Sequence, residues 1–111
     1  MVARRRFRRG EVHLVGLDPS LGSEIRKTRP CLIVSPDELN DHLRTIIVAP
    51  MATGGRSYPW RIRCQFQRRS GFVAVDQLRT LDSHRLLKRL GRLTPSTLAK
   101  VLETLQEMFA E

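Results

Sequence analysis

The spacing of apolar residues changes near Thr94, and this change constrains the fold more than any other feature of the chain. Before Thr94, apolar residues come in short runs bounded by turn residues, as in strands. After it, Thr94 can cap a helix whose first position is Pro95. The apolar residues then recur at helical spacing: Leu98, Val101, Leu102, Leu105, Met108 and Phe109. We therefore expect a mainly β domain (α+β) with a C-terminal helix packed on its sheet.

The expected strands occupy residues 11–17, 32–34, 45–49, 60–66 and 72–75. Residues 60–66 alternate strictly between apolar and polar side chains, whereas residues 45–49 are apolar throughout and are predicted to form a central strand. Residues 36–41 have room for a single helical turn, and residues 86–93 fit either a short helix or a closing strand. Short strands followed by one long helix predict a small, strongly bent sheet or half-open barrel.

The charge of the chain points to a polyanionic partner. The net charge is +9, and 17 of the 20 basic residues are arginine, whose planar fork suits phosphate. The aromatic content of 5% is too low for a module that binds RNA on an aromatic sheet surface. Residues 1–9 contain a run of arginines and are predicted to be a mobile basic arm, with residues 10–111 as the single domain. The arm either adds salt-dependent affinity for nucleic acid or is a solvated tail.

Other features narrow the class of protein further. Cys31 and Cys64 show no C-x-x-C pairing and are expected to be reduced thiols, with a disulfide between them as the alternative. The scattered histidines lack metal-ligand spacing, so we expect no metal or cofactor. The apolar runs are too short to span a membrane. The N-terminus lacks a charged segment followed by an apolar one, which favours a cytoplasmic protein.

Two segments have the composition of phosphate-binding loops. In residues 22–36 a charged loop leads into an apolar strand, and Pro30 pushes Arg29 toward an extended conformation at the junction. An arginine held there can bind a phosphate, or it can be an ordinary solvated side chain. In residues 50–59 the small residues around Gly54, including Thr53, can supply backbone N–H groups and a hydroxyl to a phosphate. The alternative is a plain hairpin loop.

Three groups of motifs, in this order along the chain, resemble the MazF/PemK toxins, the ribonuclease halves of bacterial type II toxin–antitoxin pairs. They are Gly10-Glu11-Val12 with Asp18-Pro19, Gly22-Ser23-Glu24, Thr28-Arg29-Pro30 and Ser35-Pro36; Ala49-Pro50 to Thr53 with Tyr58-Pro59; and the segment 76–82, DQLRTLD. The resemblance implies an SH3-like (CcdB/PemK-like) bent antiparallel barrel with a C-terminal helix, assembled as a homodimer. It also implies metal-independent, sequence-specific cleavage of single-stranded messenger RNA to 2′,3′-cyclic phosphate and 5′-hydroxyl ends, which inhibits translation and growth. The implied protein partner is an antitoxin with a disordered acidic segment.

The resemblance assigns roles to particular residues. Arg29 matches the arginine before proline and would stabilise the charge that develops on the phosphate, and Thr53 would orient that phosphate. Glu24 and Asp76 are candidates for the base or for positioning groups, and each can instead be a structural ion-pair partner. The side chains expected to bind RNA are Arg26, Lys27, Arg56 and Arg79.

The chain also departs from the family pattern. Ser23 stands where the PemK branch has a histidine, and Ala74 stands where it has an arginine, so the sequence looks closer to the MazF branch. Without that arginine, the support for Asp76 as the base is weaker. Ile25 replaces a common glutamine. Two other functions fit the same observations: a gyrase-poisoning toxin of this fold, and a non-catalytic nucleic-acid-binding module that depends on its basic arm.

Overall fold

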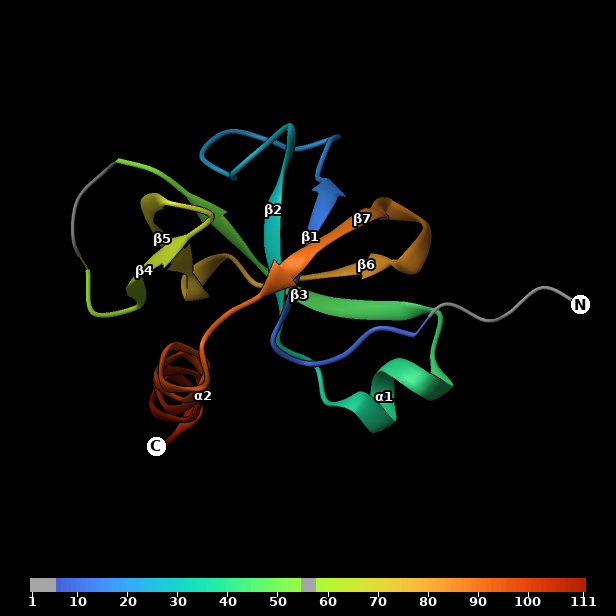
Figure 1. Ribbon diagram of the computed structural model, residues 1–111. Coiled ribbons are helices and arrows are strands. Elements are labelled where there is room, and N and C mark those ends of the chain that lie inside the picture. The colour runs from blue at the N-terminus through green and yellow to red at the C-terminus, as the bar shows by residue number, and fades with distance from the viewer. Residues whose placement is uncertain (1–5, 55–57) are drawn as a thin grey trace, which may run out of the picture.

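The computed structural model describes residues 6–54 and 58–111 as one curled sheet with a long helix against one side (Figure 1). Its elements are β1 (Glu11–Gly16), β2 (Thr28–Ile33), α1 (Asp37–His42), β3 (Thr45–Ala52), β4 (Arg61–Phe66), β5 (Arg69–Ala74), the 3₁₀ turn η1 (Val75–Gln77), β6 (Arg79–Asp82), the 3₁₀ turn η2 (Ser83–Arg85), β7 (Leu86–Arg92) and α2 (Pro95–Phe109). Residues 86–93, for which the sequence left two options, thus form a strand. Within the described residues, no helix is long and apolar enough to cross a membrane.

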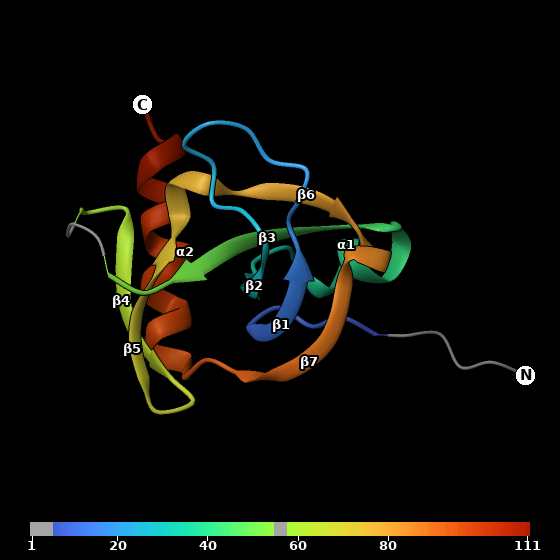
Figure 2. The same ribbon diagram turned by 90° about the horizontal axis from the view of Figure 1, so that it is seen from above.

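All strand pairs are antiparallel, and the strands follow the order β4-β5-β3-β2-β1-β7, with β6 also paired to β3. β3 is the central strand, as predicted, because it pairs with β2 on one side and with β6 and then β5 on the other. The β4–β5 hairpin and α1 lie at opposite ends of β3 (Figure 2). This curled antiparallel half-barrel with its C-terminal helix is the predicted fold class.

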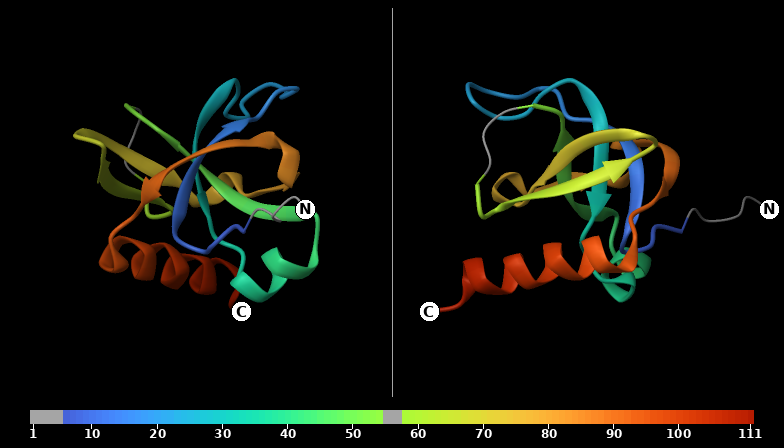
Figure 3. Two further views of the ribbon diagram at one scale, coloured as in Figure 1. Left: turned by 45° about the vertical axis from the view of Figure 1, so that its right-hand side comes forward. Right: turned by 60° about the vertical axis from the view of Figure 1, so that its left-hand side comes forward.

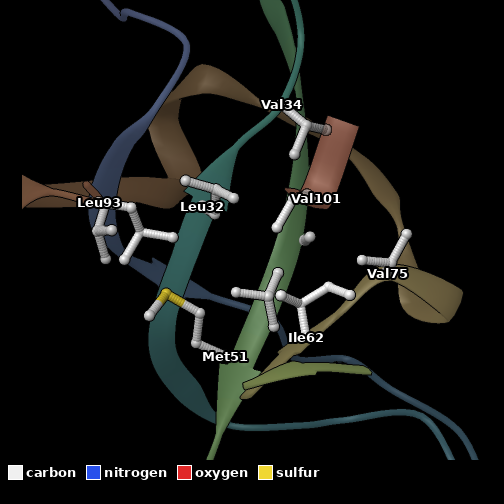
Figure 4. Close-up of a cluster of buried hydrophobic side chains, with 10 residues drawn as sticks. Leu32, Val34, Met51, Ile62, Val75, Leu93 and Val101 are labelled. Atoms are coloured by element: carbon white, nitrogen blue, oxygen red, sulfur yellow. The ribbon is translucent and has the colours of Figure 1, made fainter. Parts of the chain in front are cut away.

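The core has two parts because neighbouring residues of β2 and β3 point to opposite faces and are buried on both. One part contains Leu32, Ala49 and Met51 and is covered by α2 through Val101 (Figures 3 and 4). The other part contains Cys31, Ile33 and Val48 and fills the inside of the curl. This double burial explains why residues 45–49 are apolar without alternation. Each such aliphatic side chain contributes about 1.5–3 kcal/mol to stability when fully buried.

The predicted start of α2 is confirmed. The Thr94 hydroxyl accepts a hydrogen bond from the backbone N–H of Thr97 at 3.4 Å, and Pro95 occupies the first turn, where its missing N–H is not needed. Part of the apolar stripe of α2 packs on the sheet, with Leu98 and Leu105 beside the buried Val101, whereas Met108 and Phe109 at the end of the helix are exposed.

Several strands are longer than their local sequence indicates. β2 begins at Thr28 rather than at residue 32, and β3 continues through Pro50 to Ala52. Pro50 is tolerated because it lies where β3 changes partner from β6 to β5, so the ladder on that side is already interrupted. β5 begins at Arg69, because residues 69–71 pair with β4 although their composition favours a turn.

The segment 7–9, expected in a mobile arm, packs against the domain instead. Phe7 is buried in the inner core, and its carbonyl accepts a hydrogen bond from the side chain of Asn40 at 3.3 Å. Arg8 pairs with Asp41 at 3.2 Å, and the backbone N–H of Arg9 donates to Asp37 at 2.7 Å. Part of the basic run therefore anchors the chain to α1. Residues 1–5, the rest of the predicted arm, lie outside the described residues.

Glu11 on β1 is 7% exposed, and its carboxylate makes several polar contacts. It accepts hydrogen bonds from the backbone N–H of Arg8 at 3.0 Å and from Nε of Arg89 at 2.7 Å, and it lies 3.2 Å from Nε2 of His13. Burial alone would raise the pKa of Glu11, but these hydrogen bonds outweigh burial and hold the pKa below its ordinary value. The charged carboxylate therefore stabilises the fold.

This network predicts an acid-sensitive contribution to stability. Because the folded-state pKa of Glu11 lies below its unfolded value, the stabilisation is present above the unfolded pKa and is lost as pH falls through the folded pKa. We expect Glu11→Gln to lower the free energy of unfolding by about 1–3 kcal/mol at neutral pH. Urea denaturation of both proteins at pH 7 and at about pH 3 should show the difference shrinking toward acid. A difference that stays constant with pH would contradict the assignment.

Candidate functional site: a cationic cleft between β2 and the β4–β5 hairpin

The cleft forms where two paired strands separate. β2 and β3 pair from Ile33↔Val48 to Cys31↔Pro50, and beyond that point they take different partners. Residues 28–30 stay with β1, whereas Met51 and Ala52 join β5. The separation leaves an opening between the N-terminal end of β2 and the β4–β5 hairpin.

This cleft has a volume of about 340 Å³ and brings together residues from four strands and two loops. Its lining includes Arg29 and Thr53, the two residues predicted to contact the reacting phosphate, with Arg69, Ser70 and Phe72 from β5. Among the described lining residues the charged side chains are arginines, and none is a carboxylate. The cleft therefore suits an anionic ligand with an apolar part.

Arg29 is held in place through its Nε nitrogen, which leaves the two terminal nitrogens of the guanidinium available. It lies in β2 opposite Val15 of β1, and its Nε donates to the carbonyl of Arg26 at 2.9 Å. Within the part of the chain that the structure describes, the two terminal nitrogens of Arg29 have no hydrogen-bonding partner. A guanidinium fixed at Nε and open at both terminal nitrogens can bind a phosphate in bidentate fashion.

Thr53 directly follows β3, on the opposite wall of the cleft. Its position depends on a close approach between β3 and β5, because a Cβ on Gly71 would lie 2.5 Å from the carbonyl oxygen of Ala52 and 3.6 Å from Cγ2 of Thr53. The β3–β5 pairing at Ala52↔Phe72 continues this contact. The missing side chain of Gly71 thus lets the Ala52 backbone, and with it the adjoining Thr53, pack against β5.

Other predicted residues lie in a second pocket of about 370 Å³, lined by Glu24, Asp76 and Arg79 together with Ser23, Gln77 and Leu78. Glu24 accepts a hydrogen bond from the backbone N–H of Leu21 at 2.5 Å, which closes a turn of the β1–β2 loop. Arg79 donates to the carbonyl of Leu17 at 2.6 Å and to the hydroxyl of Ser20 at 3.3 Å. Both side chains brace the loop that carries Arg26, and their catalytic or RNA-binding roles stay predictions.

Gln77 ties the same loop to η1. Its Oε1 accepts from the N–H of Ile25 at 2.7 Å, and its Nε2 donates to the carbonyl of Ser23 at 3.3 Å. Arg26 and Lys27 are exposed on this loop, and Lys27 adopts a positive φ of 72°. The β1–β2 loop is thus tied to η1 by both polar atoms of the Gln77 side chain. Arg56, also predicted to bind RNA, lies outside the described residues.

Asp76 has an arginine partner that the sequence reading missed. Arg61 binds it in bidentate fashion, with Nε–Oδ1 and Nη2–Oδ2 distances of 3.1 Å each. Arg61 stands directly across from Ala74, so the neighbouring strand supplies a guanidinium to Asp76. The hydrogen bonds that Arg61 donates to Asp76 raise the pKa of Arg61. With both carboxylate oxygens engaged, Asp76 is better suited to positioning Arg61 than to removing a proton.

Cys31 follows Arg29 by two positions in β2 and is fully buried. Burial raises the pKa of its thiol to about 12, although the nearby charges of Arg79 and Arg29 act in the opposite direction. Cys31 and Cys64 are both free, as expected. In the described residues no group of three or more His, Cys, Asp or Glu side chains could hold a metal ion.

The sequence reading also missed Arg69 and Gly71. The β4–β5 turn consists only of Gln67 and Arg68, whose φ angles are 51° and 64°, so Arg69 already belongs to β5 and lines the cleft. A two-residue turn with positive φ at both positions joins strands tightly even without glycine or asparagine. The sequence carried one signal of this arrangement: Arg68 and Arg69 are not usual turn residues, which argues against a long turn between β4 and β5.

The chain is thus a mainly β half-barrel with a C-terminal helix and a cationic cleft, and comparisons with known proteins define its family. A family model described as PemK-like, MazF-like toxin of type II toxin–antitoxin systems matches residues 8–109. The endoribonuclease toxin ChpB of Escherichia coli (strain K12) is 34% identical over 113 residues, covering 96% of this chain and 97% of that protein. This chain therefore belongs to the PemK/MazF-like toxin family.

Solved structures agree with this assignment. MazF from Deinococcus radiodurans superposes with a TM-score of 0.84 at 24% identity, covering 95% of this chain and 97% of that one, which supports the fold. An endoribonuclease in complex with its cognate antitoxin, from a mycobacterial species, superposes with a TM-score of 0.76 at 27% identity, covering 90% and 91%.

Proposed function

We propose that this chain is the toxin of a type II toxin–antitoxin pair and cleaves single-stranded RNA, including messenger RNA, without a metal ion. The observation that carries the proposal is the pairing of Arg29 and Thr53 across one cleft without carboxylates among its described lining residues. The curated relative ChpB is named an endoribonuclease toxin, which supports the same activity here. Cleavage of messenger RNA in the cytoplasm would inhibit translation and growth.

The reaction needs no external nucleophile. The ribose 2′-hydroxyl loses its proton and its oxygen forms a bond to the adjacent phosphorus, while the bond from phosphorus to the 5′-oxygen breaks. The departing 5′-oxygen takes up a proton, so the products carry a 2′,3′-cyclic phosphate and a 5′-hydroxyl. Arg29 binds the phosphate oxygens as negative charge accumulates, and the Thr53 hydroxyl orients the same phosphate. Glu24 and Asp76 remain candidates for the base or for positioning.

The proposal includes two protein partners. A second copy of this chain would form a homodimer, and an antitoxin would place a disordered acidic segment in the cleft. Arg29 and Arg69 supply complementary charge for such a segment. The superposition on a mycobacterial endoribonuclease solved with its antitoxin supports the existence of an antitoxin partner.

Mapping the ends of RNA fragments in the presence of EDTA tests the proposal. We expect cuts at short single-stranded sequences that leave 2′,3′-cyclic phosphate and 5′-hydroxyl ends at the same rate with and without EDTA. Loss of cleavage in EDTA would contradict the metal-independent mechanism. Intact RNA of varied sequence, together with co-purification of gyrase, would favour the gyrase-poisoning alternative. Binding that disappears when residues 1–5 are deleted, which leaves the buried Phe7 in place, without any cleavage, would favour a non-catalytic module.

A further inference from the structure

The only tyrosine and the only tryptophan of the chain stack on each other at the surface. The ring centroids of Tyr58 and Trp60 are 5.5 Å apart and their planes differ by 3°. Tyr58 is 37% exposed and Trp60 is 40% exposed, although large aromatic side chains gain most stability when buried. An exposed, mutually stacked pair therefore needs an explanation other than core packing.

The pair is held rigidly by a turn and a strand. The backbone N–H of Arg61 donates to the carbonyl of Tyr58 at 3.0 Å, which closes a turn with Pro59 at its second position. The N–H of Val75 donates to the carbonyl of Trp60, also at 3.0 Å, and ties the turn to the end of β5. The backbone carbonyls of both aromatic residues are thus held by hydrogen bonds from Arg61 and Val75.

Arg61, which is held by Asp76, contacts both the Tyr58 ring and a residue of the cleft. The guanidinium of Arg61 lies 5.5 Å from the Tyr58 ring centroid and 5.1 Å from that of Phe72, and it is fixed by its two hydrogen bonds to Asp76. Phe72 lines the cleft that contains Arg29 and Thr53, and Asp76 lines the second pocket. Arg61 therefore links the Tyr58 ring to one residue of each pocket, Phe72 and Asp76.

We propose that Tyr58 and Trp60 form a stacking site for a nucleobase of the RNA strand whose phosphate occupies the Arg29–Thr53 cleft, an inference that rests on the proposed function. Single-stranded RNA is bound by stacking its splayed bases on aromatic rings while cations hold the backbone. Every base has a π-face, so the site accepts any base and favours the larger purines. Arg61 and Asp76 act as positioning residues, because they hold the Tyr58 ring rather than touch the base.

The fluorescence of Trp60 measures base binding at this site directly, because Trp60 is the only tryptophan of the chain and a stacked base quenches its emission. The probes are a 2′-O-methyl adenine oligonucleotide of about eight nucleotides, which cannot be cleaved, and an abasic sugar-phosphate oligomer of the same length. We expect the adenine oligonucleotide to quench Trp60 and the abasic oligomer to bind more weakly without quenching. Equal affinity and equal quenching by both would overturn the stacking site. Quenching by polyglutamate as strong as that by the oligonucleotide would do the same and would assign the pair to an acidic protein ligand.

Variants separate stacking from catalysis. Trp60→Ala should weaken binding of the adenine oligonucleotide about 5- to 150-fold, measured by anisotropy of a labelled strand, and Trp60→Phe should restore part of this loss. In cleavage assays Trp60→Ala should raise KM and leave kcat near that of the wild type. The matched control is Phe109→Ala, which removes a 74% exposed ring from the end of α2 and should change neither value. Unchanged binding by Trp60→Ala would refute the proposal.

Failure of this inference and failure of the proposed function give different results. The fluorescence titration uses an oligonucleotide without a free 2′-hydroxyl, so it reads binding whether or not the protein cuts RNA. A wild-type protein that cuts RNA, but whose Trp60 is not quenched, retains the function and loses the stacking site. A wild-type protein that is quenched, but leaves all RNA intact, retains the stacking site and loses the nuclease function.

Discussion

Replacing Arg29 by alanine is expected to lower the rate of RNA cleavage at saturating substrate by roughly 100- to 1,000-fold or more, the usual effect of removing a donor that stabilises transition-state charge. The guanidinium is fixed at Nε by the Arg26 carbonyl and presents its remaining nitrogens to the cleft. Only one hydrogen bond is lost, so the free energy of unfolding should change by no more than about 1 kcal/mol. Single-turnover cleavage of a short RNA and thermal unfolding measure the two effects.

Two companion variants show whether charge or geometry matters at this position. Arg29→Lys keeps the positive charge but loses the planar fork, so its cleavage rate should lie between those of the wild type and the alanine variant. Arg26→Ala removes an exposed cation from the adjoining loop and leaves the carbonyl that holds Arg29. It should weaken RNA binding mainly at low salt. Full activity in Arg29→Ala would remove this residue from the mechanism.

The second large effect is expected for Gly71→Ala, which should both destabilise the protein and impair cleavage. The new Cβ would lie 2.5 Å from the carbonyl oxygen of Ala52, and a backbone atom cannot move aside as a flexible side chain can. Overpacking of this kind costs about 1–3 kcal/mol. Displacement of Ala52 would carry Thr53 with it, and a misplacement of about 1 Å at a reacting group lowers rates on the order of 100-fold. Thermal unfolding and cleavage at a temperature where the variant stays folded measure both effects.

The matched control for this variant is Gly16→Ala. A Cβ at Gly16 meets no atom within 4 Å, so the substitution should change stability by no more than about 0.5 kcal/mol and leave cleavage intact. Thr53→Ala provides a second comparison, because it should impair cleavage without the loss of stability. If Gly71→Ala behaved like Gly16→Ala, the close approach of β5 to β3 would not be what positions Thr53.

Most of the fold was predictable because its signals are local. The strict alternation of residues 60–66 predicts β4, the apolar run of residues 45–49 predicts the central β3, and Thr94 with Pro95 predicts the start of α2. The extensions of β2 through Arg29 and of β5 through Gly71 were not predictable. Pro30 predicts an extended Arg29 but not its pairing, and residues 69–71 have the composition of a turn, so both segments become strands only because β1 and β4 pair with them.

The sequence by itself determined the chemistry that this protein can offer. Its arginine-rich composition favours an anionic partner, and the order of its motifs singled out Arg29 and Thr53, because these features depend on residue type and spacing along the chain. The tertiary structure alone decided which of the candidate residues meet. Arg29 and Thr53 share one cleft because β2 and β3 separate beyond Cys31↔Pro50, whereas Glu24, Asp76 and Arg79 line another pocket. The pairing of Arg61 with Asp76 was likewise hidden, since it depends on strand register, which joins residues far apart in the sequence.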